Sequence, residues 1–133
     1  MIDIVELAQG VAKEVGNGAV ISLAPDYTLR DVKEALRIVV VPVGIDHRML
    51  SRSHREDTFK IQIGVLRKAT EDELQDLIRY VQNVARDFFR KKIRHCVCIS
   101  ARHEPLFVPD HLKERRQFTS VIELTFKEVE NQW

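Results

Sequence analysis

Three consecutive segments decide the fold: LRIVVVPVGI at residues 36–45, DHRMLSRSHRED at residues 46–57 and FKIQIGV at residues 59–65. The first is dense in Val and Ile on both faces, which is typical of a strand that is covered on both sides or lies at the centre of a sheet. The third alternates apolar and polar residues, which predicts a half-buried strand. Together they predict a long hairpin, with a bulge or an edge contact at Pro42, because proline cannot donate to a ladder.

The charged segment from Asp46 to Asp57 is predicted to be the loop at the tip of this hairpin. Hairpin loops usually have about two to five residues, so a loop of this length and charge indicates contacts outside the subunit. We expect an oligomer or partner interface formed by Asp46, His47, Arg48, Arg52, His54, Arg55 and Asp57. Exposed loop charges contribute little to stability, so these arginines should matter for assembly and not for folding.

The same tip contains the residue types that act as general acids and bases, because histidines and carboxylates lie close together in it. It has no Gly-rich phosphate cradle, and Ser51 and Ser53 are its only candidate nucleophiles. Loops on rigid hairpins commonly carry binding functions. The sequence therefore favours a contact loop over an active site, and we expect no enzymatic activity and no catalytic residues.

Two helices are predicted from apolar periodicity. The first begins with a capping box of Asp3 and Glu6, and its apolar face ends at Gly16. The second begins with a capping box of Thr70 and Glu73 and carries a continuous apolar stripe over residues 74–88. Both helices should pack on the sheet through these apolar faces.

The remaining segments complete a fold of one domain over residues 1–133. Strands are predicted at residues 19–23, 96–101 and 118–129, a turn or two of helix at 28–35, and a short helix or ordered loop at 109–116. The expected fold class is α+β, with a mainly antiparallel sheet of about four to five strands, an N-terminal helix and a long central helix packed against it.

The chain is nearly neutral, with 21 Lys and Arg against 20 Asp and Glu. Its overall charge therefore does not select nucleic acid, an acidic substrate or a membrane surface as a partner. The N-terminus has no basic and apolar signal segment, and no long apolar run occurs, so we expect a soluble, unexported protein without a membrane partner.

Cys96 and Cys98 are expected to be reduced core thiols. Zinc binding by His95, Cys96, Cys98 and His103 is disfavoured because a CxC strand lacks knuckle geometry, so no metal or cofactor is expected.

A basic run from Arg86 to Arg94 offers an alternative function, that of a small nucleic-acid-binding module. Its candidate phosphate contacts are Arg90, Lys91, Lys92 and Arg94. The run also lies at the end of the predicted central helix, where cations complement the helix dipole and meet unpaired carbonyls. Nucleic-acid readers interleave such charge with aromatics, and only Phe88 and Phe89 are near, so the structural role is favoured.

Three stretches resemble the tail terminator, or tail completion, proteins of long-tailed bacteriophages, a head-to-tail joining family. They are VVVPVG at residues 39–44 leading into Ser51-Arg52, DTFKIQIGV at residues 57–65 with the helix that follows, and FTSVIELTF at residues 118–126. The resemblance covers most of the chain in the order of its elements, including the N-terminal helix.

This resemblance implies a structural virion protein of the phage tail or neck. Such a subunit forms a ring, typically a hexamer, that caps the tail tube and presents a surface to the head connector. Its partners would be further copies of itself, the tail tube protein and the connector or neck protein, with DNA passing through the ring without specific binding. It would be assembled in the host cytoplasm, and the hairpin tip would line the ring or face a neighbouring ring.

Overall fold

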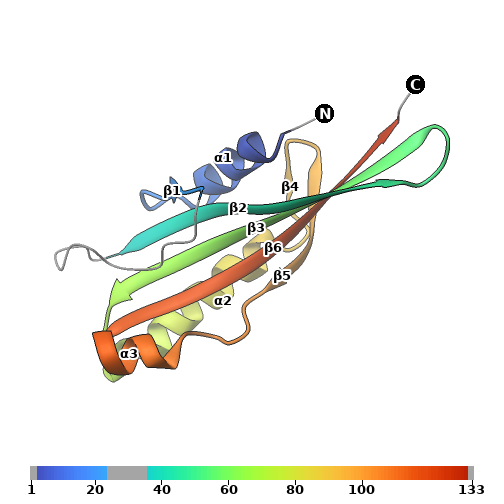
Figure 1. The fold of residues 1–133 in the computed structure, drawn as a ribbon. Coiled ribbons are helices and arrows are strands. Elements are labelled where there is room, and N and C mark those ends of the chain that lie inside the picture. The colour runs from blue at the N-terminus through green and yellow to red at the C-terminus, as the bar shows by residue number, and fades with distance from the viewer. Residues whose placement is uncertain (1–2, 24–35, 132–133) are drawn as a thin grey trace.

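A long antiparallel hairpin forms the centre of the structure. The computed structural model describes residues 3–23 and 36–131 (Figure 1). In it, β2 (Arg37–Met49) pairs with β3 (His54–Lys68) along nearly its whole length. The ladder changes register between Pro42 and Gly44, so the bulge predicted at this proline is confirmed.

The hairpin belongs to a six-stranded sheet with the order β1-β2-β3-β6-β5-β4. β6 (Gln117–Asn131) lies antiparallel to β3, and β5 (Cys96–Arg102) lies antiparallel to β6. Two short strands flank these four: β1 (Val20–Ile21) runs parallel to β2, and β4 (Lys92–Ile93) runs antiparallel to β5. The sheet is strongly twisted, and the β2–β3 end reaches well past the helices (Figure 1).

Two helices pack on one face of this sheet. α1 (Ile4–Val15) and α2 (Leu74–Phe88) join the same buried cluster, to which the four long strands also contribute. Its side chains include Leu7, Ala8 and Val11 of α1, Leu77, Val81, Ala85 and Phe88 of α2, and Ile38, Val40, Phe59, Ile61, Ile63, Ile122, Leu124 and Phe126 of the sheet. This cluster is the main core, and it confirms the apolar faces predicted for both helices.

The other face of β2 is also buried at its beginning. Val39 and Val41 form a second, smaller cluster with Leu66 of β3. The two faces of this strand segment are therefore both covered, as its unbroken run of Val and Ile predicted.

The start of α1 follows the sequence prediction and that of α2 does not. The Asp3 side chain accepts a hydrogen bond of 2.8 Å from the Glu6 backbone N–H, which confirms this cap. Before α2, residues Glu71–Glu73 form a short 3-10 helix (η1), and Thr70 makes no side-chain capping bond. The predicted capping box is wrong here because Glu73 instead pairs with Arg67 of β3, 3.2 Å away.

The element count also differs from the expectation. The sheet has six strands instead of four to five, because β4 has only two residues and therefore carries no periodicity that a sequence could display. A third helix, α3 (Pro109–Arg115), forms where a short helix or ordered loop was predicted. The helical turn predicted at residues 28–35 lies outside the described residues.

Candidate functional site

The end of the hairpin is an arm built from strands instead of a long loop. It comprises residues 43–58 of β2, β3 and their connecting turn, together with residues 127–131 of β6, which pair with β3. The ladder continues until Met49 opposite Arg55, so only residues 50–53 connect the strands. The prediction of a twelve-residue loop from Asp46 to Asp57 is therefore wrong. Within these strands His47 lies opposite Asp57, and Arg48 lies opposite Glu56.

The arm exposes large apolar side chains along β2. Val43 is 49% exposed, Ile45 46% and Met49 70%, and Leu50 in the turn is similarly exposed. Ile45, His47 and Met49 share the helix-side face of the sheet, since they are paired with Phe59, Asp57 and Arg55. The sequence did not reveal this apolar stripe, because Ile45 was expected at the end of the first strand and Met49 and Leu50 within the loop.

The predicted interface residues are divided between the surface and the interior of the arm. Asp46, His47, Arg48, Arg52 and His54 are exposed, and the His54 ring lies at hydrogen-bonding distance from the Ser51 and Ser53 hydroxyls of the turn, at 3.2 and 3.0 Å. Arg55 is mostly buried, and Asp57 is fully buried within the subunit. Asp57 therefore cannot itself contact a partner, and its charge acts inside the fold.

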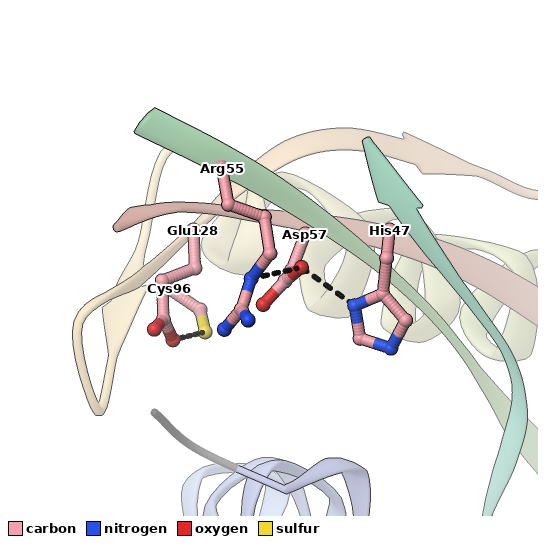
Figure 2. A network of polar contacts seen from close by, with 5 residues as sticks. All are labelled: His47, Arg55, Asp57, Cys96 and Glu128. Atoms are coloured by element: carbon pink, nitrogen blue, oxygen red, sulfur yellow. Dashed lines mark hydrogen bonds and ion pairs between the residues drawn. The ribbon is translucent and has the colours of Figure 1, made fainter. Parts of the chain in front are cut away.

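Asp57 is the centre of a polar row that crosses the sheet at the base of the arm (Figure 2). It lies opposite His47 on β2 and opposite Glu128 on β6. Its Oδ1 is 2.6 Å from His47 Nδ1 and 3.2 Å from Arg55 Nε. In Figure 2 the Arg55 guanidinium lies between the carboxylates of Asp57 and Glu128. These charged side chains therefore link β2, β3 and β6 at the position in the sheet where the apolar core ends.

Cys96, on β5, is the last residue of this row. Its Sγ donates a hydrogen bond of 3.3 Å to Glu128 Oε2 (Figure 2). Burial, strengthened by the bond to Glu128 and by its negative charge, raises the pKa of Cys96 to about 12. The thiol is therefore a neutral donor at physiological pH and a poor nucleophile.

The chemistry of this cluster suits fixing the arm more than catalysis. The His47–Asp57 contact has the composition of an acid/base dyad, but Asp57 is already engaged by Arg55, and the nearby thiol is held protonated. Buried charge pairs discriminate strongly between registers, because a shifted strand would leave a charge unpaired. The row therefore specifies how β2, β3 and β6 align where the arm leaves the core.

The basic run after α2 is partly neutralised within the fold. Lys91 Nζ is 3.1 Å from Glu14 Oε2, and it lies over the Phe88 ring at 5.3 Å from the centroid. Arg94 is 3.8 Å from Glu6, also on α1. Two of the four predicted phosphate contacts thus tie the β4 region to α1, which weakens the nucleic-acid alternative; Lys92 and Arg90 remain exposed.

The cysteine cluster does not have the arrangement of a metal centre. Cys96 and Cys98 are both buried and free, which confirms the prediction of core thiols, whereas His95 lies exposed in the turn before β5 with φ of 72°. Among the described residues, no group of three or more His, Cys, Asp or Glu side chains could hold a metal ion. In the same part of the chain, no helix is long and apolar enough to cross a membrane.

An open hollow of about 970 Å³ lies between the start of α2 and α3, at the opposite end of the molecule from the arm. Its lining includes the apolar residues Leu74, Phe107 and Leu112 and the basic residues Lys113 and Arg116. Phe107 stacks on Phe118 of β6 with ring centroids 6.0 Å apart. The hollow thus rests on the core.

Comparison with known proteins does not assign the chain to a family. No protein-family model matches it, and no curated protein has a significant match.

Proposed function

We propose that this chain is a structural protein of a bacteriophage tail or neck, a tail terminator that assembles into a ring. The proposal starts from the resemblance of residues 39–44, 57–65 and 118–126 to this family. The observation that carries it is the arm, which holds exposed apolar side chains on a rigid ribbon.

The arm has the features of a subunit contact. Val43, Ile45 and Met49 lie along an edge strand, and a long apolar edge invites pairing with another chain. Natural proteins blunt or cover such edges, so an edge left apolar is best explained by a partner that covers it. The row of His47, Asp57 and Glu128 would hold the arm in one orientation for that partner.

A ring is the assembly that best suits this subunit. Closed rings are built from heterologous contacts, in which one surface meets a different surface of the next copy. The arm is a projecting surface on one side of an elongated subunit (Figure 1). Head-to-tail contacts through it would generate a ring, with a hexamer as the typical member of the family.

In this role the protein acts by assembly and not by catalysis, and it needs no cofactor. The ring would cap the tail tube, stop its growth and present a surface to the head connector, and DNA would pass through it without specific binding. Its place would be the tail or neck of the virion, after assembly in the host cytoplasm.

The test is the assembly state of the full chain. Size-exclusion chromatography with light scattering should give a species of several copies, and electron micrographs should show closed rings that bind the ends of tail tubes. A strict monomer at the highest attainable concentration, without binding to tubes or connectors, would contradict the proposal.

A further inference from the structure

The sheet has an open edge along β2. β1 covers β2 only at Val39 and Val40, with one further hydrogen bond from Ser22 N–H to the Val40 carbonyl. Within the described residues, no strand lies beside the outer edge of β2 from Val43 to Met49. This edge carries the exposed apolar side chains of the arm.

A second open edge lies on the opposite side of the sheet, along β5. β4 covers β5 at Cys96 and Val97, and the Lys91 carbonyl accepts a hydrogen bond of 2.9 Å from the Cys98 N–H. In the described part of the chain, no strand covers β5 from Ile99 to Arg102. Val97 and Ile99 of this strand are exposed.

We infer that the β2 edge of one copy pairs with the β5 edge of the next copy, so that one sheet continues between subunits. The inference rests on the proposed function, because it names the surfaces through which the ring would close. Open edges on opposite sides are what a heterologous, head-to-tail contact requires.

Strand direction supports this junction. β2, β3, β6 and β5 alternate in direction, so β2 and β5 run opposite to each other within one subunit. When the sheet continues from β5 to the β2 of a similarly oriented neighbour, the new pair is therefore antiparallel. The alternation is preserved, and the unpaired backbone groups of both edges gain partners.

Side-chain charge favours one register of the pair. Asp46 and Arg102 both point to the face opposite the helices, since they are paired with Thr58 and Glu123. A register that sets Asp46 opposite Arg102 also sets Met49 opposite Ile99, two exposed apolar residues. Opposite charges and apolar pairs directly across a ladder are the stabilising combinations.

Disulfide trapping between two variants, each with one added cysteine, tests this contact. Asp46→Cys and Arg102→Cys proteins are purified separately, mixed and mildly oxidised. Residues directly opposite in an antiparallel pair have Cβ atoms about 4.5–5.5 Å apart, close enough for a disulfide after a small adjustment. The native cysteines are buried, so they should not compete.

The expected result is a cross-linked heterodimer in the mixture and none with either variant alone. Asp76→Cys, on the exposed side of α2, replaces Asp46→Cys as the control and should give no cross-link with Arg102→Cys. Rings that form normally but give no cross-link above this control would overturn the inference and leave the proposed function intact. Cross-linking of Asp46→Cys with itself would also overturn it, because this indicates a symmetric contact. A protein that stays monomeric would overturn both proposals.

Discussion

Asp57 is a buried carboxylate on which two side chains of the arm converge. His47, whose side chain is 56% exposed, and the mostly buried Arg55 both contact the same oxygen, Oδ1. Among the described residues, the other oxygen, Oδ2, makes no hydrogen bond. The permanent cation that faces Asp57 is Arg55, at 3.2 Å, and His47 forms a hydrogen bond of 2.6 Å with the same oxygen.

We predict that Asp57→Asn lowers the free energy of unfolding by about 2–4 kcal/mol, because Arg55 loses the charge that compensates its partial burial. Urea denaturation followed by circular dichroism measures this. His47→Ala is the matched control on the other side of Asp57; it should cost about 1 kcal/mol or less, since half of that side chain is already in water. Equal losses in the two variants would contradict the assignment of Arg55 as the main partner.

Cys96 gives a prediction for the dependence of stability on pH. The pKa of this thiol is about 12 in the native state against 9.0 for a free thiol, so between these values only the unfolded chain ionises. The unfolded state then binds fewer protons, and the free energy of unfolding falls as pH rises from about 9 to 12. Below pH 9 this contribution is constant.

The measurement compares urea midpoints of the parent and Cys96→Ser at several pH values from 8 to 11. A serine keeps the donor to Glu128 but does not ionise in this range, whereas all other groups titrate alike in both proteins. The parent should lose stability more steeply, by at most about 1.4 kcal/mol per pH unit. Parallel pH profiles would show that the thiol of Cys96 does not titrate differently in the two states.

Among the elements, α2 is the clearest case of prediction from periodicity. Leu77→Ala should destabilise the fold by about 2–4 kcal/mol, because removal of the buried side chain leaves a cavity in the core. Gln82→Ala changes an exposed position of the same helix and should alter stability by no more than about 0.5 kcal/mol. Thermal unfolding of both variants tests this; similar losses would mean that helix propensity, and not packing, dominates.

The arm is the element that sequence periodicity did not resolve. Its strands carry too much charge to resemble buried strands, yet the charges are arranged in cross-strand pairs: His47 lies opposite Asp57, and Arg48 opposite Glu56. This complementarity was present in the sequence, but it can be recognised only after the register of the hairpin is known. The two-residue strand β4 had no local signal at all, since its pairing depends on a turn with two residues of positive φ, Arg94 and His95.

The structure separates two arginines that the sequence placed together in one exposed loop. Arg52→Glu, in the turn, should change the free energy of unfolding by less than about 0.5 kcal/mol. Arg55→Glu should destabilise the fold by about 3 kcal/mol or more, since it sets a second carboxylate beside the buried Asp57. The two variants change net charge equally, so chemical denaturation of both isolates the effect of position. Equal stability would argue against the ion pair at the base of the arm.

At the scale of the whole molecule, the arrangement of open edges is a property of topology. The order β2-β3-β6-β5 leaves parts of the second and fifth of the six described strands without a neighbouring strand, on opposite sides of the sheet. The candidate interface residues could be found partly from sequence, because charge marked the arm. The apolar side chains on its edge, and the matching edge of β5, appear only once the strands are assembled.

Two edges that meet head to tail predict a specific result for mixed variants. Ile45→Lys should disable the β2 edge, and Ile99→Lys the β5 edge, so neither protein alone should assemble, because burying an unpaired charge in the contact is costly. Mixed together, the first protein still has an intact β5 edge and the second an intact β2 edge. They should therefore form one-to-one heterodimers that cannot extend, which light scattering distinguishes from monomers and rings.

Leu106→Lys, which is similarly exposed but lies on neither edge, should assemble like the parent. A symmetric contact between β2 edges would instead leave Ile99→Lys fully assembled, and that outcome would exclude a head-to-tail junction.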